Sequence, residues 1–249
     1  MNLAKRYLIG INNVLFCIRH GYFQYIMLRA APSLYGVYLK IRYKDEIYAY
    51  AHIQKIIYQV LSARDPKVAC VGSFDEHENY NYEEYLLKYF KGDRGLALDF
   101  GCGMGRMIRR MGRIFERVDG VDISEHNLKC AMEYCSESIQ QPNLYLSNGI
   151  IFPQIEDNTY DIAYSTIAVQ HIPVHSTRML ILSELYRILK PGSHLAIQMT
   201  YIDNIRNHQK YIDSAADMKP KTGIAAWHEN ATWAMTTNSG YDVIIDTRL

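Results

Sequence analysis

The residues best suited to chemistry form a glycine-rich loop after a short apolar run. Residues 95–100 are mostly apolar and carry Asp99 near their end, and Gly101, Gly103 and Gly105 follow at every second position. Glycines allow backbone amides to come close to a ligand, and a loop of this kind between a strand and a helix is a polar cradle. By itself the loop predicts a nucleotide-like ligand without deciding which one.

The spacing of the glycines distinguishes between classes of ligand. A dinucleotide-binding fingerprint, GxGxxG, needs its third glycine at position 106, so that strand and helix can pack closely around a pyrophosphate. Arg106 stands there instead, and the third glycine is Gly105. The spacing therefore disfavours a dinucleotide.

Short apolar runs alternate with longer helical patterns from about residue 76 to residue 200. The patterns predict strands at 95–100, 117–121, 144–146, 160–165 and 194–200, and helices at 106–115, 125–138 and 176–189. Ser124 is placed to cap the second helix, and Pro191-Gly192 to end the third. Strands separated by single helices indicate an α/β fold with a doubly wound, mostly parallel sheet. We expect one domain over residues 76–249, with a ligand crevice at the carboxyl ends of its strands.

The first quarter of the chain differs in charge from the rest. Residues 1–60 hold eight Lys or Arg against two acidic residues, a net of +6, which leaves 19 basic and 24 acidic residues elsewhere, a net of −5. We expect residues 1–75 to form a helical accessory or lid segment. Two interpretations stay open: a helical layer with its basic side chains in solvent, or a basic face that meets an anionic substrate or a membrane surface.

Composition excludes several classes of protein. The 249 residues are 49% hydrophobic and 21% charged, as in an ordinary globular protein, and a net charge of +1 argues against a nucleic-acid binder. The five cysteines form no CxxC pair, so we expect a reducing cytoplasm and no zinc site. The apolar stretch at 7–18 is too short to span a bilayer and lacks a signal-cleavage pattern.

The loop and the residues after the next two strands resemble the class I S-adenosylmethionine-dependent methyltransferases, of the methyltransferase type 11/12-like kind. Their first motif reads acid-x-Gly-x-Gly-x-Gly, and the resemblance covers about residues 76–200, including Leu182 to Gly192 before the fifth strand. It implies that Asp122 accepts hydrogen bonds from both ribose hydroxyls of S-adenosylmethionine. Asn148 stands where the family usually has an Asp that contacts adenine. The implied cofactor-binding residues are Asp99, Gly101, Cys102, Gly103, Gly105, Arg106, Asp122, Ile123, Asn148, Gly149 and Thr166.

Each of these assignments has a structural alternative. Asp99 could cap the loop, Asp122 could cap the following helix, and Asn148 could be a turn residue. Arg106 begins a stripe of arginines at helical spacing, which we expect to be solvated apart from Arg106 itself; the others are Arg110, Arg113 and Arg117.

The resemblance implies methyl transfer to a small polar acceptor, such as an oxygen of a sugar, a phosphorylated metabolite or a natural product. An oxygen nucleophile needs a proton acceptor, and His171, just after the fourth strand, is the candidate catalytic residue. Its alternative role is to shape the cofactor pocket or begin the next helix. Two other functions stay open: a non-catalytic relative that binds S-adenosylmethionine, and a nicotinamide-dependent oxidoreductase.

The last fifty residues carry fewer signals. Asp203, His208 and His228 follow the fifth strand, and we expect them to be surface or packing residues. Trp227 and Trp233 favour a final helix that leads to a sixth strand at 240–245. The family's sheet commonly ends in a hairpin of two strands, so a seventh strand is missing, supplied by the early segment, or truncated.

Overall fold

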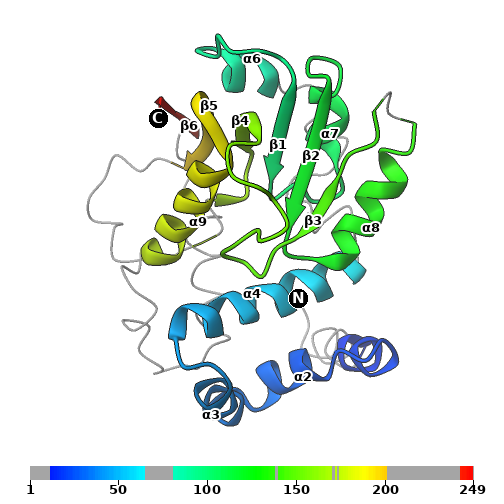
Figure 1. Cartoon of the computed structure of the whole chain (residues 1–249). Helices are drawn as coiled ribbons and strands as arrows, with labels where there is room; N and C mark the ends of the chain where they lie inside the picture. The colour runs from blue at the N-terminus through cyan, green and yellow to red at the C-terminus, as the bar shows by residue number, and fades with distance from the viewer. Residues whose placement is uncertain are drawn as a thin grey trace.

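The computed structural model describes residues 12–64, 81–137, 140–169, 172, 174–200 and 242–248. They build one six-stranded sheet in the order β3-β2-β1-β4-β5-β6, in which β6 alone is antiparallel (Figure 1). The strands are β1 (Leu96–Phe100), β2 (Arg117–Asp122), β3 (Leu144–Leu146), β4 (Tyr160–Ser165), β5 (Leu189–Thr200) and β6 (Asp242–Arg248). The predicted doubly wound, mostly parallel sheet is confirmed.

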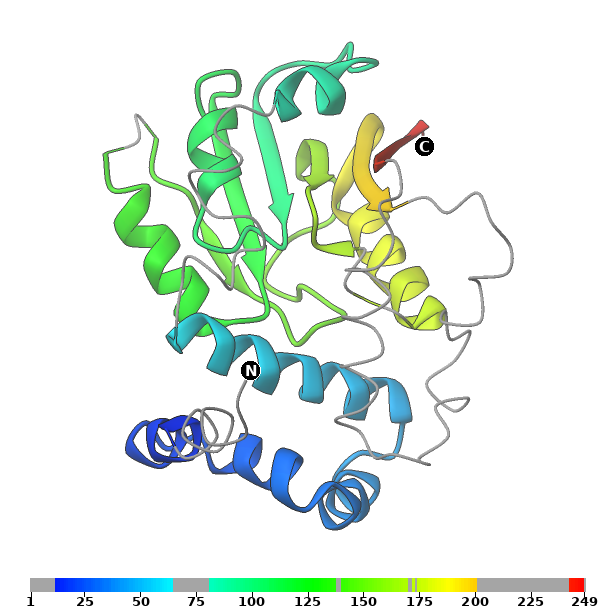
Figure 2. The ribbon, with the colours of Figure 1, turned by 180° about the vertical axis from the view of Figure 1, so that it is seen from behind.

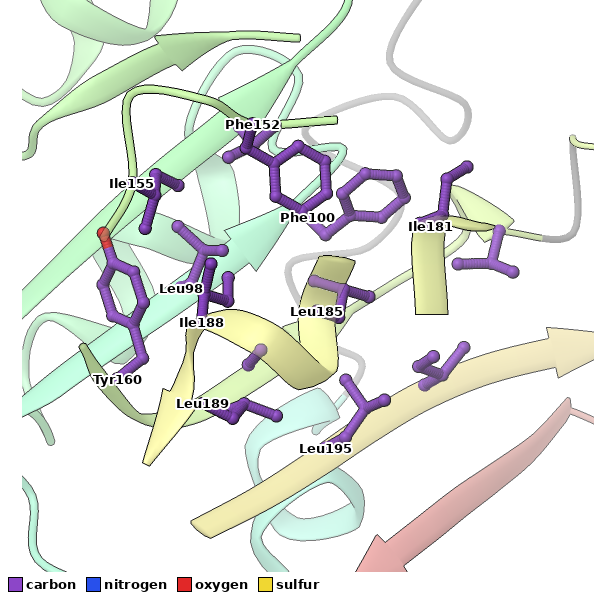
Figure 3. Close-up of a cluster of buried hydrophobic side chains, with 14 residues drawn as sticks. Leu98, Phe100, Phe152, Ile155, Tyr160, Ile181, Leu185, Ile188, Leu189 and Leu195 are labelled. Carbon is purple, nitrogen blue, oxygen red and sulfur yellow. The ribbon is translucent and has the colours of Figure 1, made fainter. Parts of the chain in front are cut away.

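Helices cover both faces of this sheet because its buried strands alternate their side chains between the two. Ala97 of β1 packs in a cluster with α6 (Tyr82–Leu87) and α7 (Arg106–Met111), whereas Leu98 packs with α9 (His175–Ile188). Figure 3 shows the second cluster, in which the rings of Phe100 and Phe152 lie 5.6 Å apart. α8 (Glu125–Tyr134) packs along β2 and β3. The two clusters hold the carboxyl ends of the strands in place.

The N-terminal segment is helical, as predicted. Residues 12–19 are helical, and they are followed by α2 (Phe23–Ala30), α3 (Pro32–Arg42) and α4 (Glu46–Arg64). α4 crosses beneath the carboxyl ends of the strands and contacts α8, while α2 and α3 lie on its far side (Figures 1 and 2). An apolar cluster joins these three helices: Leu28, Tyr35, Leu39, Ile53 and Ile57. Across the described ranges, no helix has the length and hydrophobicity needed to cross a membrane.

Several predicted boundaries are wrong by a few residues. α7 ends at Met111, where Gly112 caps it, and not at residue 115. α8 ends at Tyr134 and not at residue 138. Pro191-Gly192 lies within β5, because Leu189 already has an extended backbone and pairs with Tyr160. Regular pairing then resumes at His194, so the Pro-Gly pair occupies an irregularity of the ladder.

The C-terminal predictions have a mixed outcome. β6 spans Asp242–Arg248 and pairs antiparallel with β5, close to the expected position of a last strand. Trp227 and Trp233 lie outside the described residues, as do Asp203, His208 and His228.

Gly105 has a backbone conformation that positions the glycine loop on α8. It caps α7 with a φ of +85°, in the left-handed region, and a Cβ there would lie 2.9 Å from Sγ of Cys135. Gly192 has a similar φ of +79° but open space around it. An alanine in place of Gly192 would therefore meet backbone strain alone, whereas an alanine in place of Gly105 would also be crowded.

We expect Gly192→Ala to lower the free energy of unfolding by about 1 kcal/mol, the cost of a left-handed alanine alone. Gly105→Ala should lower it by about 3 kcal/mol, because overpacking against Cys135 adds to that cost. Urea unfolding followed by circular dichroism measures both. Equal losses in the two variants would mean that the loop does not pack closely on α8.

Candidate active site

A pocket opens at the carboxyl edge of the sheet, where the strand order reverses between β1 and β4. Such a switch point is where open α/β sheets bind ligands. The pocket is lined from the ends of β1, β2, β3 and β4, from α4, and from the start of α9. The predicted cofactor residues that line it are Asp99, Gly101, Cys102, Gly103, Arg106, Asp122, Ile123, Gly149 and Thr166. Gly105 and Asn148 are not among its lining residues.

The Asp122 carboxylate connects three elements at the end of β2. Its Oδ2 accepts a hydrogen bond from the Gly103 amide at 2.9 Å, and its Oδ1 accepts from the Ser124 amide at 2.8 Å and from Nδ2 of Asn127 at 3.1 Å. Burial raises the pKa of Asp122, and these hydrogen bonds oppose the rise by stabilising the charged form. Asp122 thus holds the glycine loop and the start of α8 together.

These contacts limit what Asp122 can offer a ligand. A carboxylate has about four acceptor positions; three of them accept the hydrogen bonds given above, and the Ile123 amide also stabilises the charged form. A ribose hydroxyl would therefore share or displace a protein donor. The Gly103 amide is one such donor, on a loop that lines the pocket.

The amides of the glycine loop are mostly engaged within the protein. Those of Gly101 and Cys102 donate to the Val121 carbonyl at 2.8 and 3.0 Å, and that of Gly105 donates to the Cys102 carbonyl at 2.9 Å. Together with the Gly103 amide on Asp122, four loop amides have partners. A ligand can therefore approach the backbone of the loop closely, but most of the loop amides already donate within the protein.

Asp99 and Arg106 are lining residues on either side of the glycine loop, and the guanidinium acts on the carboxyl group. Burial raises the pKa of Asp99 to about 8, although Arg106 lowers it. The Arg106 guanidinium lies over the ring of Tyr82, 5.0 Å from its centroid, and its Nη1 has no hydrogen-bond partner among the described residues. A ligand with a cationic group near Asp99 would favour the ionised carboxylate.

Asn148 is engaged in a turn. Its Oδ1 accepts hydrogen bonds from the amides of Ile150 and Ile151, both at 3.0 Å, and the residue is exposed. The neighbouring residues Ser147 and Gly149 line the pocket instead. Contact between Asn148 and adenine stays a prediction, and the structure favours the alternative of a turn residue.

Sequence reasoning missed the contribution of α4. Tyr50, Gln54 and Tyr58 repeat every four residues and line the pocket, whereas Ile53 and Ile57 pack toward α2 and α3. The helix is fixed at the start of α8, because the hydroxyls of Ser62 and Ser124 lie 2.8 Å apart. The four-residue spacing of Tyr50, Gln54 and Tyr58 was visible in the sequence, but the sequence did not show which side of the helix faces the sheet.

Five buried polar atoms in the pocket lining have no hydrogen-bond partner among the described residues. They are Tyr50 OH, Gln54 Oε1, Arg106 Nη1, Asn127 Oδ1 and Thr177 Oγ1. Leaving such a group unsatisfied costs about 1–3 kcal/mol, so native proteins rarely keep several of them together. Their convergence on one pocket points to a polar ligand.

Two further predictions concern residues near the pocket. His171 lies outside the described residues, so its role stays a prediction, although Ile172 lines the pocket. The arginine stripe is not simply solvated: Arg110 forms an ion pair with Glu83, and Arg117 binds the buried Asp119 at 2.9 Å.

Comparisons with known proteins agree with this geometry. Residues 98–197 match the family described as "Methyltransferase domain". Residues 98–197 therefore carry a methyltransferase domain of the class I S-adenosylmethionine-dependent kind. This identification decides against the nicotinamide-dependent alternative, as the position of Gly105 had indicated.

Curated relatives are similar in sequence to part of this chain. Phosphoethanolamine N-methyltransferase 2 of Caenorhabditis elegans is 31% identical over 141 residues, which cover 51% of this chain and 32% of that protein. Sterol 24-C-methyltransferase of Saccharomyces cerevisiae is 27% identical over 186 residues, which cover 71% of this chain and 46% of that protein. The chain thus spans less than half the length of both relatives.

A solved structure shows the same fold. Phosphoethanolamine N-methyltransferase 1 of Haemonchus contortus, in complex with phosphoethanolamine and S-adenosylhomocysteine, aligns with a TM-score of 0.51. The alignment covers 60% of this chain and 32% of that one at 10% identity.

We expect Asp122→Asn to weaken the binding of S-adenosylmethionine by about 30-fold or more, because the variant loses the charge that strengthens a hydrogen bond from a hydroxyl. Asn148→Ala is the matched control and should change the affinity by less than about threefold, since its side chain serves a turn. Isothermal titration calorimetry measures both, with thermal unfolding to check that each variant is folded. A folded Asp122→Asn with ordinary affinity would remove Asp122 from the donor site, and a large loss in Asn148→Ala would restore the adenine contact.

Proposed function

We propose that this methyltransferase domain transfers a methyl group from S-adenosylmethionine to a small, uncharged polar acceptor. The acceptor would bind between α4 and α9, beside the glycine loop. The observation that carries this proposal is the set of buried, unpartnered polar atoms on those two helices.

The donor end of the pocket is supported by Asp122 and its neighbours. A ribose hydroxyl would bind the Asp122 carboxylate, and the Asn127 Oδ1 beside it, which has no hydrogen-bond partner among the described residues, would accept from a second one. Asp99 and Arg106 at the loop suit the ammonium and carboxylate of an amino-acid group, respectively. These residues fit the chemistry of S-adenosylmethionine.

α4 lies across the pocket from this donor end to α9. At one end, Tyr58 lines the pocket, and burial and the Asp122 carboxylate raise the pKa of its hydroxyl. Tyr50, two turns earlier and roughly 12 Å along the helix axis, packs against Val174 at the start of α9. The helix therefore spans both the donor and the acceptor ends.

The lining residues at the acceptor end offer hydrogen bonds and no charged side chain, and the Arg178 guanidinium, which donates to the carbonyl of the lining residue Ile172, lowers the pKa of Tyr50 against the effect of burial. Gln54 Oε1 can only accept, whereas the Tyr50 and Thr177 hydroxyls can both donate and accept. Burial raises the pKa of Tyr50 well above its ordinary value, so its hydroxyl keeps its proton at neutral pH. A hydroxyl or neutral amine of the acceptor would satisfy all three atoms.

Charge in the lining also favours an uncharged acceptor. Arg106 is the only Lys or Arg among the described lining residues, and its charge acts on the buried Asp99. The basic residues of the first helices lie elsewhere: Lys40, Arg42 and Lys44 are exposed, and Lys55 contacts Glu125 at 3.6 Å. The net charge of residues 1–60 is therefore a poor guide to the acceptor.

S-adenosylmethionine supplies an already activated methyl group, so the protein's task is mainly to align the partners and exclude water. α4 crosses the carboxyl edge of the sheet (Figure 2), and its side chains line the pocket. Tyr50, Gln54 and Thr177 would orient the acceptor's nucleophilic atom. An oxygen nucleophile must lose its proton, and we propose His171, predicted from the sequence, as the group that takes it.

Methyl-labelled S-adenosylmethionine, incubated with fractionated pools of small metabolites, tests the proposal. We expect label to move into a neutral compound, and Tyr50→Phe to lower the rate about tenfold or more by leaving the acceptor without one hydrogen bond. Tyr50→Phe should leave donor affinity within about twofold of the unmodified protein, since the donor end is separate.

Tyr48→Phe is the control, because Tyr48 lies on the same helix and is exposed. If Tyr50→Phe behaves like Tyr48→Phe, the acceptor does not bind at α4. If the donor binds but no pool accepts label, the non-catalytic alternative is favoured.

A further inference from the structure

Large apolar side chains are exposed mainly in the first helices. Nine of the sixteen exposed large hydrophobic residues in the described ranges lie between residues 12 and 42: Val14, Leu15, Ile18, Phe23, Met27, Leu34, Val37, Tyr38 and Ile41. Scattered exposed apolar residues are ordinary, but a concentration of them marks an interaction surface. We call these nine residues the outer apolar surface.

α3 shows that this surface is a regular feature of the helix. Leu34, Val37, Tyr38 and Ile41 follow the i, i+3, i+4, i+7 spacing of one helix face, and Leu34 and Ile41 are 67% and 81% exposed. The residues that pack inward, Tyr35 and Leu39, belong to the cluster with α4. Within the described part of the chain, packing accounts for the inner row, whereas the outer row stays exposed.

Charge in the same segment has one sign. Residues 12–44 contain Arg19, Arg29, Lys40, Arg42 and Lys44, and no Asp or Glu. Helices that combine apolar and basic residues in this way are typical of segments that lie in the interface of a bilayer. Anionic lipid headgroups attract such basic residues, which adds to the burial of the apolar side chains.

The outer apolar surface is separate from the active site. α2 and α3 lie on the far side of α4 from the sheet (Figures 1 and 2), and none of the nine residues lines the pocket. The surface is therefore not explained by donor or acceptor binding.

We propose that residues 12–44 dock the protein on the surface of an anionic phospholipid bilayer. The apolar rows of these helices would enter the headgroup region while the basic side chains contact lipid phosphates. A second copy of the chain is a poorer occupant, because a symmetric interface would bring together two segments that each contain five basic residues and no Asp or Glu.

Vesicle co-sedimentation of the full chain, without methyl donor, tests this docking. We expect the protein to sediment with vesicles of phosphatidylcholine and phosphatidylglycerol, more weakly with phosphatidylcholine alone, and less as salt is raised. The double variant Leu34→Ser with Ile41→Ser should lower the partition coefficient about tenfold or more, since two exposed apolar side chains no longer enter the interface.

The matched control is Met132→Ser with Met179→Ser, which removes two exposed apolar side chains from α8 and α9 and should bind as the unmodified protein does. Lys40→Glu with Lys44→Glu should also reduce binding to the mixed vesicles. Absence of sedimentation, equal binding by the first double variant and the control, or binding unaffected by lipid charge would each overturn the proposal. So would light scattering that shows a dimer which the Leu34 and Ile41 changes dissociate.

Discussion

The hydrogen-bonded Asp122 carboxylate is the contact on which the rest of the site depends. It ties the glycine loop after β1 to the end of β2 and the start of α8, through Gly103, Ser124 and Asn127. A buried carboxylate is stable only when donors surround it, so the three elements and the charge require one another. Asp122 lines the pocket, which lies at the point where the strand order reverses between β1 and β4.

α4 joins this donor-side network to the rest of the molecule. Its C-terminal end contacts Ser124 through Ser62, and its middle lines the pocket. Its apolar residues Ile53 and Ile57 pack against α2 and α3. One helix thus connects the proposed methyl-donor site, the proposed acceptor site and the outer apolar surface.

The sequence predicted the sheet well because strands depend on local patterns, and most of the proposed donor residues line one pocket. Apolar runs determine the strands, and the loop from Gly101 to Gly105 follows one of them directly. Asn148 was harder to place, because an exposed turn and an adenine contact use the same amide oxygen. Tyr50 and Thr177 could not be placed at all, since they meet only through the long-range packing of α4 against α9.

A crystal structure of the full chain with S-adenosylhomocysteine tests the central claim most directly. The account predicts a ribose hydroxyl within hydrogen-bonding distance of Asp122, with α4 still covering the ligand. Density for the ligand away from Asp122, or a ribose that turns toward solvent while Asp122 keeps only its protein contacts, would contradict it.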